Sequence, residues 1–304
     1  MGNVVVLAGG TGGAKLARGM LDVAGADLTV IANTADDIEI YGAYVSPDPD
    51  LVTFWLADVI DERGWGLRDD TFAVMDGLRA IGVDVWFSLG DRDLAIGIER
   101  ARRLADGARL TDTLAELGAA LGVTARVLPM SDEPVRTWVQ TRAHWMGFQE
   151  FMIRNNAAGP VQDTRLRGIG EARPTPEILA AIASASAIVI GPSNPVTSIG
   201  PILSVPMMRQ ALLDSPAPIV AVSPIVGGVV LKGPTEDFMR WAGRDADHAA
   251  IAACYDGLID GLVADGSAPV DGLPVLRTDT LMTDAASRRR LATETLHFAE
   301  GLAA

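Results

Sequence analysis

Apolar residues form two kinds of pattern along this chain. Continuous apolar runs at Val4–Ala8, Leu28–Ala32, Ala187–Ile190 and Ile219–Val222 predict strands that are buried on both faces. Helically spaced apolar residues follow the first run, at Ala14–Ala24. Because the same alternation returns late in the chain, the pattern predicts an α/β fold with a doubly wound, mostly parallel, Rossmann-like sheet.

The middle of the chain departs from this alternation. Helices are predicted over 51–60, 72–81, 94–105 and 114–121, and strands of mixed polarity over 125–128, 137–141 and 148–153. A final helix is expected over 285–302. We therefore predict an α/β core formed by residues 1–45 and 171–304, with residues 46–170 as a helical and β-rich insertion.

Composition narrows the class of protein. Among 304 residues, 39 are acidic and 25 basic, which gives a net charge of −14 and disfavours binding to nucleic acids or anionic membranes. A single cysteine, Cys254, excludes an intrachain disulfide and a zinc site of several thiolates. The longest apolar stretch, 178–190, is shorter than the roughly 20 residues of a membrane span, and no basic segment precedes the first one. We expect a cytoplasmic protein.

A glycine-rich loop joins the first strand to the first helix. It consists of residues 9–15, Gly-Gly-Thr-Gly-Gly-Ala-Lys. Glycines let a ligand approach the backbone, and free N–H groups at a helix start favour an anion. The nucleotide-binding candidates here are Gly10, Thr11, Gly12, Gly13 and Lys15. Both the Walker A and the dinucleotide signatures are incomplete, and a tight strand–helix turn is the structural alternative.

Acidic residues follow the second strand, at the edge where open α/β sheets bind ligands. Asp37 ends the segment Asn-Thr-Ala-Asp-Asp, and a rigid proline separates Asp48 from Asp50. Such hard oxygen ligands suit Mg²⁺ on a diphosphate, and a carboxylate can also orient a hydroxyl nucleophile. Asp37, Asp48 and Asp50 are therefore candidate metal ligands, and Asp48 and Asp50 candidate catalytic residues. Their alternative role is to form turns.

Two proline-bounded loops follow the late strands. Gly-Pro-Ser-Asn-Pro presents Ser193 and Asn194, and Ser-Pro-Ile-Val-Gly-Gly begins at Ser223. All three are candidate nucleotide contacts, although a structural turn explains each loop equally well. The histidines, including His248, have no partner at metal-ligand spacing, which favours ordinary core or surface roles.

Together these segments resemble the 2-phospho-L-lactate transferase family, which includes the phosphoenolpyruvate transferases of coenzyme F(420) biosynthesis. Besides the loops above, the resemblance rests on Ser-Pro-Asp-x-Asp at 46–50, Asp-Thr-Phe at 70–72, Leu-Gly-Asp-Arg-Asp at 89–93 and Leu-Pro-Met-Ser-Asp at 128–132. These motifs occur in order from about residue 3 to residue 285.

The resemblance implies an Mg²⁺-dependent enzyme of the EC 2.7.8 type. Such an enzyme transfers a phospholactyl, phosphoenolpyruvyl or phosphoglyceryl group from a diphosphoguanosine donor to the deazaflavin Fo and releases GMP. The insertion would contribute the acceptor site, with Asp50, Ser88, Asp91 and Arg92 contacting the deazaflavin. Ser88 departs from relatives that carry a basic residue there. The partners would be these small molecules and, by base rate, a second copy in a homodimer.

Two other functions compete with this one. A non-catalytic protein that binds a nucleotide or nucleotide sugar can share the same glycine-loop opening. An NAD-dependent oxidoreductase would need a complete glycine fingerprint and is disfavoured. The sequence leaves open which three-carbon acid is transferred, and which aspartates bind metal or orient the hydroxyl.

Overall fold

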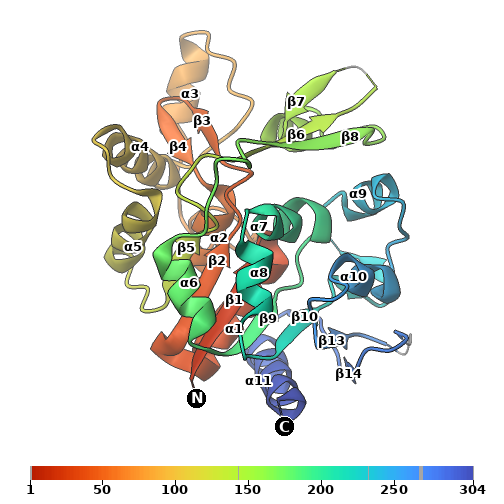
Figure 1. The fold of residues 1–304 in the computed structure, drawn as a ribbon. Helices are drawn as coiled ribbons and strands as arrows, with labels where there is room; N and C mark the ends of the chain where they lie inside the picture. Colours follow the sequence, from red (N-terminus) through yellow and green to blue (C-terminus); the bar gives the residue numbers. More distant parts are fainter. Residues whose placement is uncertain (1, 143, 232, 267–269, 304) are drawn as a thin grey trace.

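The computed structural model describes residues 2–142, 144–231, 233–266 and 270–303 (Figure 1). Within them lies a seven-stranded central sheet of order β14-β13-β10-β9-β1-β2-β5, in which every neighbouring pair is parallel. The strands are β1 (Asn3–Ala8), β2 (Leu28–Ala32), β5 (Arg126–Pro129), β9 (Ala185–Ile190), β10 (Ile219–Val222), β13 (Gly261–Ala264) and β14 (Val275–Arg277). The strand order reverses between β1 and β9. The prediction of a doubly wound α/β sheet is therefore confirmed.

Alternate side chains of β1 supply two separate cores. Val4 and Val6 face a cluster with residues of α1 (Gly10–Ala24), α2 (Pro47–Leu56) and α11 (Ala285–Leu302). Val5 and Leu7 face the opposite cluster, which helices on the other face complete. These helices are α6 (Pro176–Ala183), α7 (Gly200–Ser204), α8 (Met208–Leu213), α9 (Thr235–Trp241) and α10 (His248–Cys254). Burial on both faces explains why the strands are continuously apolar.

Two smaller units stand beyond the carboxyl ends of the central strands (Figure 1). One combines the hairpin β3 (Ile38–Ile40) and β4 (Ala43–Val45) with α3 (Ala73–Ala80) and α4 (Asp91–Ala105), and α5 (Leu110–Ala120) connects it to the sheet by packing beside β5. The other is an antiparallel sheet of order β7-β6-β8, formed by β6 (Arg136–Gln140), β7 (Trp145–Gly147) and β8 (Asp163–Arg167). Short elements complete the fold: the 3-10 turn η1 (Gly25–Asp27), the π-helical turns η2 (Glu150–Arg154) and η3 (Pro195–Ile199), and the hairpin of β11 (Ile225–Val226) and β12 (Val229–Val230).

Several predicted elements differ from the structure. The segment 46–170, predicted as an insertion, supplies β5 to the central sheet. The strand predicted over 148–153 is wrong, because a π-helical turn begins at Glu150 and buries Phe151 against Phe238. Helix α2 begins at Pro47, four residues before its predicted start, since proline and acidic residues suit a first helical turn. The final helix, Ala285–Leu302, is confirmed.

The glycine loop packs tightly against the loop after β9. A Cβ on Gly12 would lie 2.1 Å from the Pro192 carbonyl oxygen, and one on Gly13 would lie 2.6 Å from Ser193 Oγ. On the same loop, a Cβ on Gly9 would lie 2.6 Å from the Ser198 Cβ. These glycines are therefore required whether or not a ligand is bound, because Gly12 faces a backbone carbonyl and Gly9 and Gly13 face serine side chains at close range.

We predict that Gly12→Ala destabilises the protein by about 1–3 kcal/mol, because the added methyl group forces two loops apart. The measurement is urea unfolding. Gly77→Ala is the matched control: this glycine lies inside α3 with open space around its Cα, so alanine should stabilise by about 0.5–1 kcal/mol. Equal stability of the Gly12→Ala variant and the unmodified protein would contradict the role given to this contact.

Candidate active site

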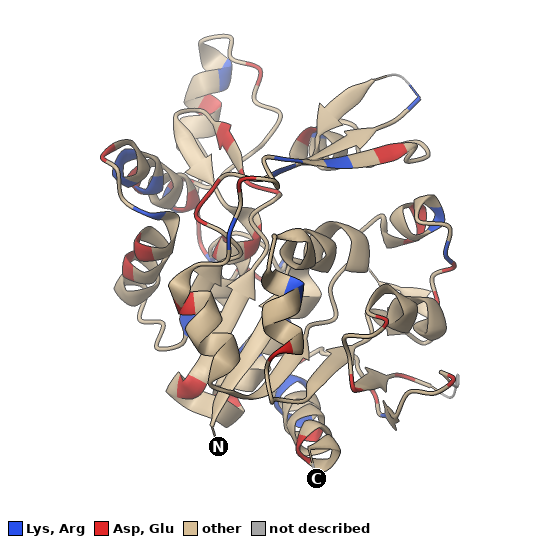
Figure 2. Cartoon of the chain, viewed as in Figure 1, with Lys and Arg blue, Asp and Glu red and all other residues tan. Residues whose placement is uncertain are grey.

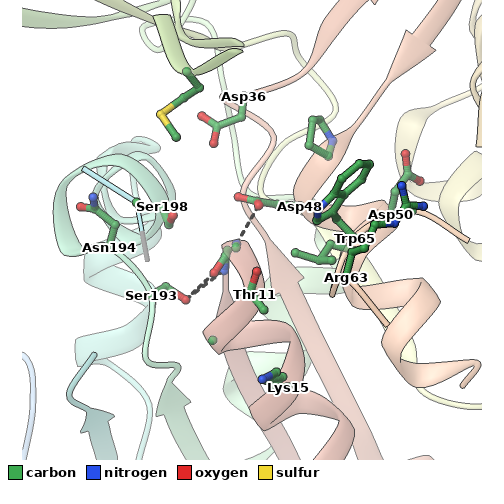
Figure 3. Close-up of a pocket in the computed structure, with 18 of the residues that line it drawn as sticks. Thr11, Lys15, Asp36, Asp48, Asp50, Arg63, Trp65, Ser193, Asn194 and Ser198 are labelled. Atoms are coloured by element: carbon green, nitrogen blue, oxygen red, sulfur yellow. Dashed lines mark hydrogen bonds between the residues drawn. The ribbon is translucent and has the colours of Figure 1, made fainter. Parts of the chain in front are cut away.

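A cavity of about 840 Å³ opens at the carboxyl edge of the central sheet, beside the reversal between β1 and β9. Several separate segments line it. They are the glycine loop with Lys15, the first turn of α2, an aromatic group of Trp65, Phe72, Trp86 and Phe87, the loop 192–198, and the segments 223–235 and 280–282. Figure 3 shows labelled side chains of the glycine loop, the first turn of α2 and the loop 192–198 around one space, with Trp65 beside them. Open α/β sheets bind their ligands at this position.

Asp48 links α2 to the glycine loop. The Gly10 amide donates to Asp48 Oδ1 at 2.7 Å, and Asn33 Nδ2 donates to Oδ2 at 2.9 Å (Figure 3). Burial raises the pKa of this carboxyl above its usual range, although both hydrogen bonds oppose the rise. Asp48 therefore lines the cavity as a fixed and partly satisfied carboxylate.

Asp36 lies near Asp48 in the close-up view and also lines the cavity (Figure 3). Its Oδ1 is buried and has no hydrogen-bond partner among the described residues. Burial, followed by the charge of Asp48, raises the pKa of Asp36 well above its usual range. Two such carboxylates favour a proton or a cation between them. The sequence analysis did not select Asp36, because nothing in the pattern separates it from Asp37.

Asp37 points elsewhere. Its carboxylate accepts a hydrogen bond from Ser46 Oγ at 2.8 Å, and it is not part of the cavity wall. Burial raises its pKa to about 7, while the nearby positive charge of Arg136 opposes the rise. Its second oxygen is buried without a hydrogen-bond partner in the described part of the chain. The structure thus places this predicted metal ligand behind the wall that Asp36 and Asp48 form.

Asp50 lines the cavity but is engaged by a buried arginine. Arg100 Nη1 donates to Asp50 Oδ2 at 3.0 Å, and Nη2 donates to Oδ1. Arg100 is 0% exposed and also donates to the Tyr44 carbonyl at 2.9 Å. Its position three residues after the buried Gly97 and six after the buried Leu94 is the sequence signal that could have identified it. The predicted catalytic carboxylate Asp50 is therefore committed to an ion pair.

Among the four residues predicted to contact the deazaflavin, Asp50 and Ser88 line the cavity, whereas Asp91 and Arg92 do not. The Asp91 carboxylate accepts hydrogen bonds from Thr71 Oγ1 at 2.6 Å and Val74 N at 2.9 Å. Arg92 donates from Nη1 to a backbone carbonyl at 3.1 Å. Both side chains hold neighbouring segments together.

The residues predicted to contact the nucleotide also differ in whether they line the cavity. Gly10, Thr11, Gly12, Lys15, Ser193, Asn194 and Ser223 line the cavity, and Gly13 packs beneath it. Ser193 Oγ donates to the Gly9 carbonyl at 2.6 Å, and Asn194 Oδ1 accepts from Val196 N at 2.9 Å. Both side chains thus shape the loop. Their contacts with a ligand stay predictions.

Ser223 has a partner that the sequence did not reveal. It is fully buried, and its Oγ lies 2.8 Å from His248 Nδ1 and accepts a hydrogen bond from Ile225 N at 3.3 Å. These bonds fix the turn after β10. Lys15, on α1, also contacts the cavity wall through the segment 280–282. Its Nζ donates to the Met282 carbonyl at 3.0 Å and lies 5.7 Å from the centre of the Trp55 ring.

Flat side chains gather at one end of the cavity. Trp65 is 51% exposed, and the Arg63 guanidinium lies 4.3 Å from the centre of its ring. Trp86 and Phe87 stack with ring centres 5.8 Å apart. An exposed tryptophan in a cavity wall offers a stacking surface for an aromatic ligand.

Charge and metal-binding geometry add two constraints. Acidic residues are prominent on the loops beyond the central strands (Figure 2). Within the described residues, no group of three or more His, Cys, Asp or Glu side chains could by itself hold a metal ion. A cation bound by fewer protein carboxylates would take its other ligands from water or from a substrate. Among the described residues, none of the helices combines the length and the apolar character that a membrane span requires.

Known proteins resemble this chain over nearly all its length. A family model described as 2-phospho-L-lactate transferase CofD matches residues 4–284. A 2-phospho-L-lactate transferase of Methanosarcina mazei is 38% identical over 95% of this chain and 98% of its own. A phosphoenolpyruvate transferase of Streptomyces griseus is 39% identical over 98% of both. A solved UPF0052-family protein of Bacillus halodurans, with 18% identity and a TM-score of 0.63 over 97% of this chain and 99% of its own, shows the fold alone.

We predict that Arg100→Met destabilises the protein by about 3–5 kcal/mol, because it leaves the Asp50 carboxylate buried without its partner. Urea unfolding at neutral pH measures this loss. Arg103→Met on the same helix is the control: its ion pairs are partly exposed, and its loss of stability should be much smaller. Similar losses in the two variants would contradict a special role for Arg100.

We predict that Asp37→Asn gains stability relative to the unmodified protein as pH rises. With a pKa of about 7 in the folded state, against about 3.9 unfolded, Asp37 binds its proton more tightly when folded. Its contribution to stability is therefore present below about pH 4 and is lost as pH rises through 7, whereas asparagine does not titrate. Urea unfolding from pH 4 to 8 should show the free energy of unfolding of Asp37→Asn rising relative to that of the unmodified protein. A constant difference would contradict the raised pKa.

Proposed function

We propose that this protein transfers a phosphorylated three-carbon acid from a diphosphoguanosine donor to the deazaflavin Fo and releases GMP. The chain belongs to the 2-phospho-L-lactate transferase CofD family. The family itself makes the protein a transferase of coenzyme F(420) biosynthesis. One observation carries the finer proposal: a single cavity contains a glycine-rich helix start, two facing carboxylates and a set of aromatic side chains.

The glycine-rich end of α1 is suited to the diphosphate. Gly9 precedes the helix and has no side chain with which to cap it, so first-turn N–H groups such as that of Gly12 are available to an anion. Lys15 adds a positive charge in the same wall. The nucleoside would then lie toward the segments 223–235 and 280–282, and the flat acceptor toward Trp65 and Trp86.

Asp36 and Asp48 have the properties that an Mg²⁺ site requires. Both are buried carboxylates in the cavity wall, and Asp36 retains an oxygen without a hydrogen-bond partner in the described structure. Mg²⁺ is commonly held by one or two carboxylates together with substrate phosphates and water. When bound, the ion would neutralise charge on the diphosphate. We therefore assign the metal to Asp36 and Asp48, in place of Asp37 and Asp50.

The chain's own residues would act mainly by positioning. In the proposed reaction, a bond forms between the acceptor's terminal hydroxyl oxygen and the phosphorus that bears the three-carbon acid. The bond from that phosphorus to the bridging oxygen breaks, GMP leaves with that oxygen, and the hydroxyl proton passes to solvent. Asp48 keeps the glycine loop in place through Gly10, and Arg100 fixes Asp50 beside the reacting groups. Alignment and charge neutralisation dominate such transfers.

The direct test incubates purified protein with Fo, Mg²⁺ and each of the phospholactyl, phosphoenolpyruvyl and phosphoglyceryl guanosine diphosphate donors. Mass spectrometry of the products identifies the acid transferred, and we expect GMP in equal amount. Binding of nucleotide without product from any donor would favour the alternative, a non-catalytic nucleotide or nucleotide-sugar binding protein. The cytoplasmic setting and the homodimer remain predictions.

We predict that Asp36→Asn and Asp48→Asn each lower turnover by about 100-fold or more at saturating Fo, because each removes charge from the proposed metal site. The readout is product formation at increasing Mg²⁺, with GDP binding in the absence of metal as a check of folding. Asp58→Asn, on an aspartate paired with Arg18 at the surface, is the control and should retain full turnover. Normal turnover in both cavity variants would refute the metal assignment.

A further inference from the structure

Helix α4 opens with three consecutive charged residues, Asp91, Arg92 and Asp93, and only the third lines the cavity. The first two hold the backbone: Asp91 accepts the N–H groups that begin α3, and Arg92 donates to the Arg68 carbonyl. Asp93 has no comparable task. Its carboxyl oxygens receive no hydrogen bond from any residue that the structure describes.

A neighbouring carboxylate holds the backbone of Asp93. Asp70 accepts hydrogen bonds from Arg92 N at 2.9 Å and Asp93 N at 3.1 Å, and so caps α4. A Cβ on Gly90 would lie 2.1 Å from Asp70 Oδ2, which shows how closely this cap fits. The first turn of α4 therefore has little freedom, and Asp93 is held in the cavity wall.

The surroundings of Asp93 combine aromatic and acidic groups. The same wall contains Trp65 and Trp86. Burial and the negative charge of Asp50, which lies two residues from Asp48 on α2, raise the pKa of Asp93 to about 7, while Arg100 opposes the rise. The next residue, Leu94, packs in a cluster with Phe72 and Phe87, which also line the cavity, and the charge interaction with Asp50 relates Asp93 to the helix that carries the proposed reaction centre.

A purely structural role accounts poorly for this placement. An acidic residue in a first helical turn stabilises the helix by about 0.3–1 kcal/mol, but it does so best when solvated. Asp91 and Asp70 already supply negative charge at the same helix end. The carboxyl oxygens of Asp93 have no hydrogen-bond partner among the described residues and remain accessible from the cavity, so a ligand in the cavity can reach them.

We propose that Asp93 contacts the acceptor, and that its carboxyl group hydrogen-bonds a hydroxyl on the chain that joins the acceptor's flat ring to its reacting oxygen. This rests on the proposed function. With the ring stacked on Trp65 or Trp86, a polyhydroxylated chain that leads to Asp48 passes the first turns of α4 and α2. Asp93 then selects for a flat molecule with a hydroxylated side chain over a bare aromatic ring.

The test measures the equilibrium binding of Fo by its fluorescence and of GDP by calorimetry, in the full-length protein and in Asp93→Ala. We expect the dissociation constant for Fo to rise about tenfold or more and that for GDP to stay within twofold, as loss of one hydrogen bond to a carboxyl predicts. Asp106→Asn, at the other end of α4, is the matched control and should change neither constant. Steady-state kinetics should show a raised KM for Fo alone.

Each other outcome overturns the assignment. Fo affinity within twofold of the unmodified protein removes Asp93 from the acceptor site, and a parallel loss of Fo and GDP affinity assigns it a structural role. If Asp93→Ala does not fold, Asp93→Ser, whose side chain is too short to make the same contact, carries the same decision. Failure of the unmodified protein to bind Fo would refute the proposed function and this contact with it, whereas an Asp93 result alone leaves that function intact.

Discussion

The active-site architecture depends on the close contact between the glycine loop and the loop that follows β9. The two loops meet closely: Gly12 faces the Pro192 carbonyl, and the short Ser193 side chain donates from Oγ to the Gly9 carbonyl. The strand order reverses at this point, so the loops leave toward opposite faces of the sheet. Their contact closes the floor of the cavity and leaves the start of α1 facing its interior.

Several carboxyl groups in and near the cavity are held in positions that are unfavourable for the stability of the fold. Asp36, Asp37, Asp48 and Asp93 all have raised pKa values because they are removed from water, and only part of their hydrogen-bonding capacity is used inside the protein. Arg100 provides buried positive charge for Asp50. Sites that sacrifice stability in this way are typical of binding and catalysis, because a ligand or cation completes what folding leaves unsatisfied.

The two smaller units and the central sheet supply chemically different groups to the cavity wall. The unit with α3 and α4 brings Phe72, Phe87 and Asp93 to one end, and η2, which follows β7, adds residues such as Met152 to the wall. The central sheet supplies the anion-binding helix start. A common core with variable surrounding units is how one α/β fold serves different ligands, so the similarity to the Bacillus halodurans structure extends to the fold and no further.

The sequence by itself predicted the central strands β1, β2, β9 and β10, the final helix, and the cavity-lining loops that follow β1, β9 and β10, because continuous apolar runs and glycine–proline punctuation are local signals. It could not place β5 in the central sheet or identify the short strands β13 and β14, since strand pairing depends on distant segments. It also could not separate Asp36 from Asp37, or Asp93 from Asp91. Which of two adjacent carboxylates faces a cavity is decided by hydrogen bonds such as Ser46 to Asp37, and these exist only after the chain has folded.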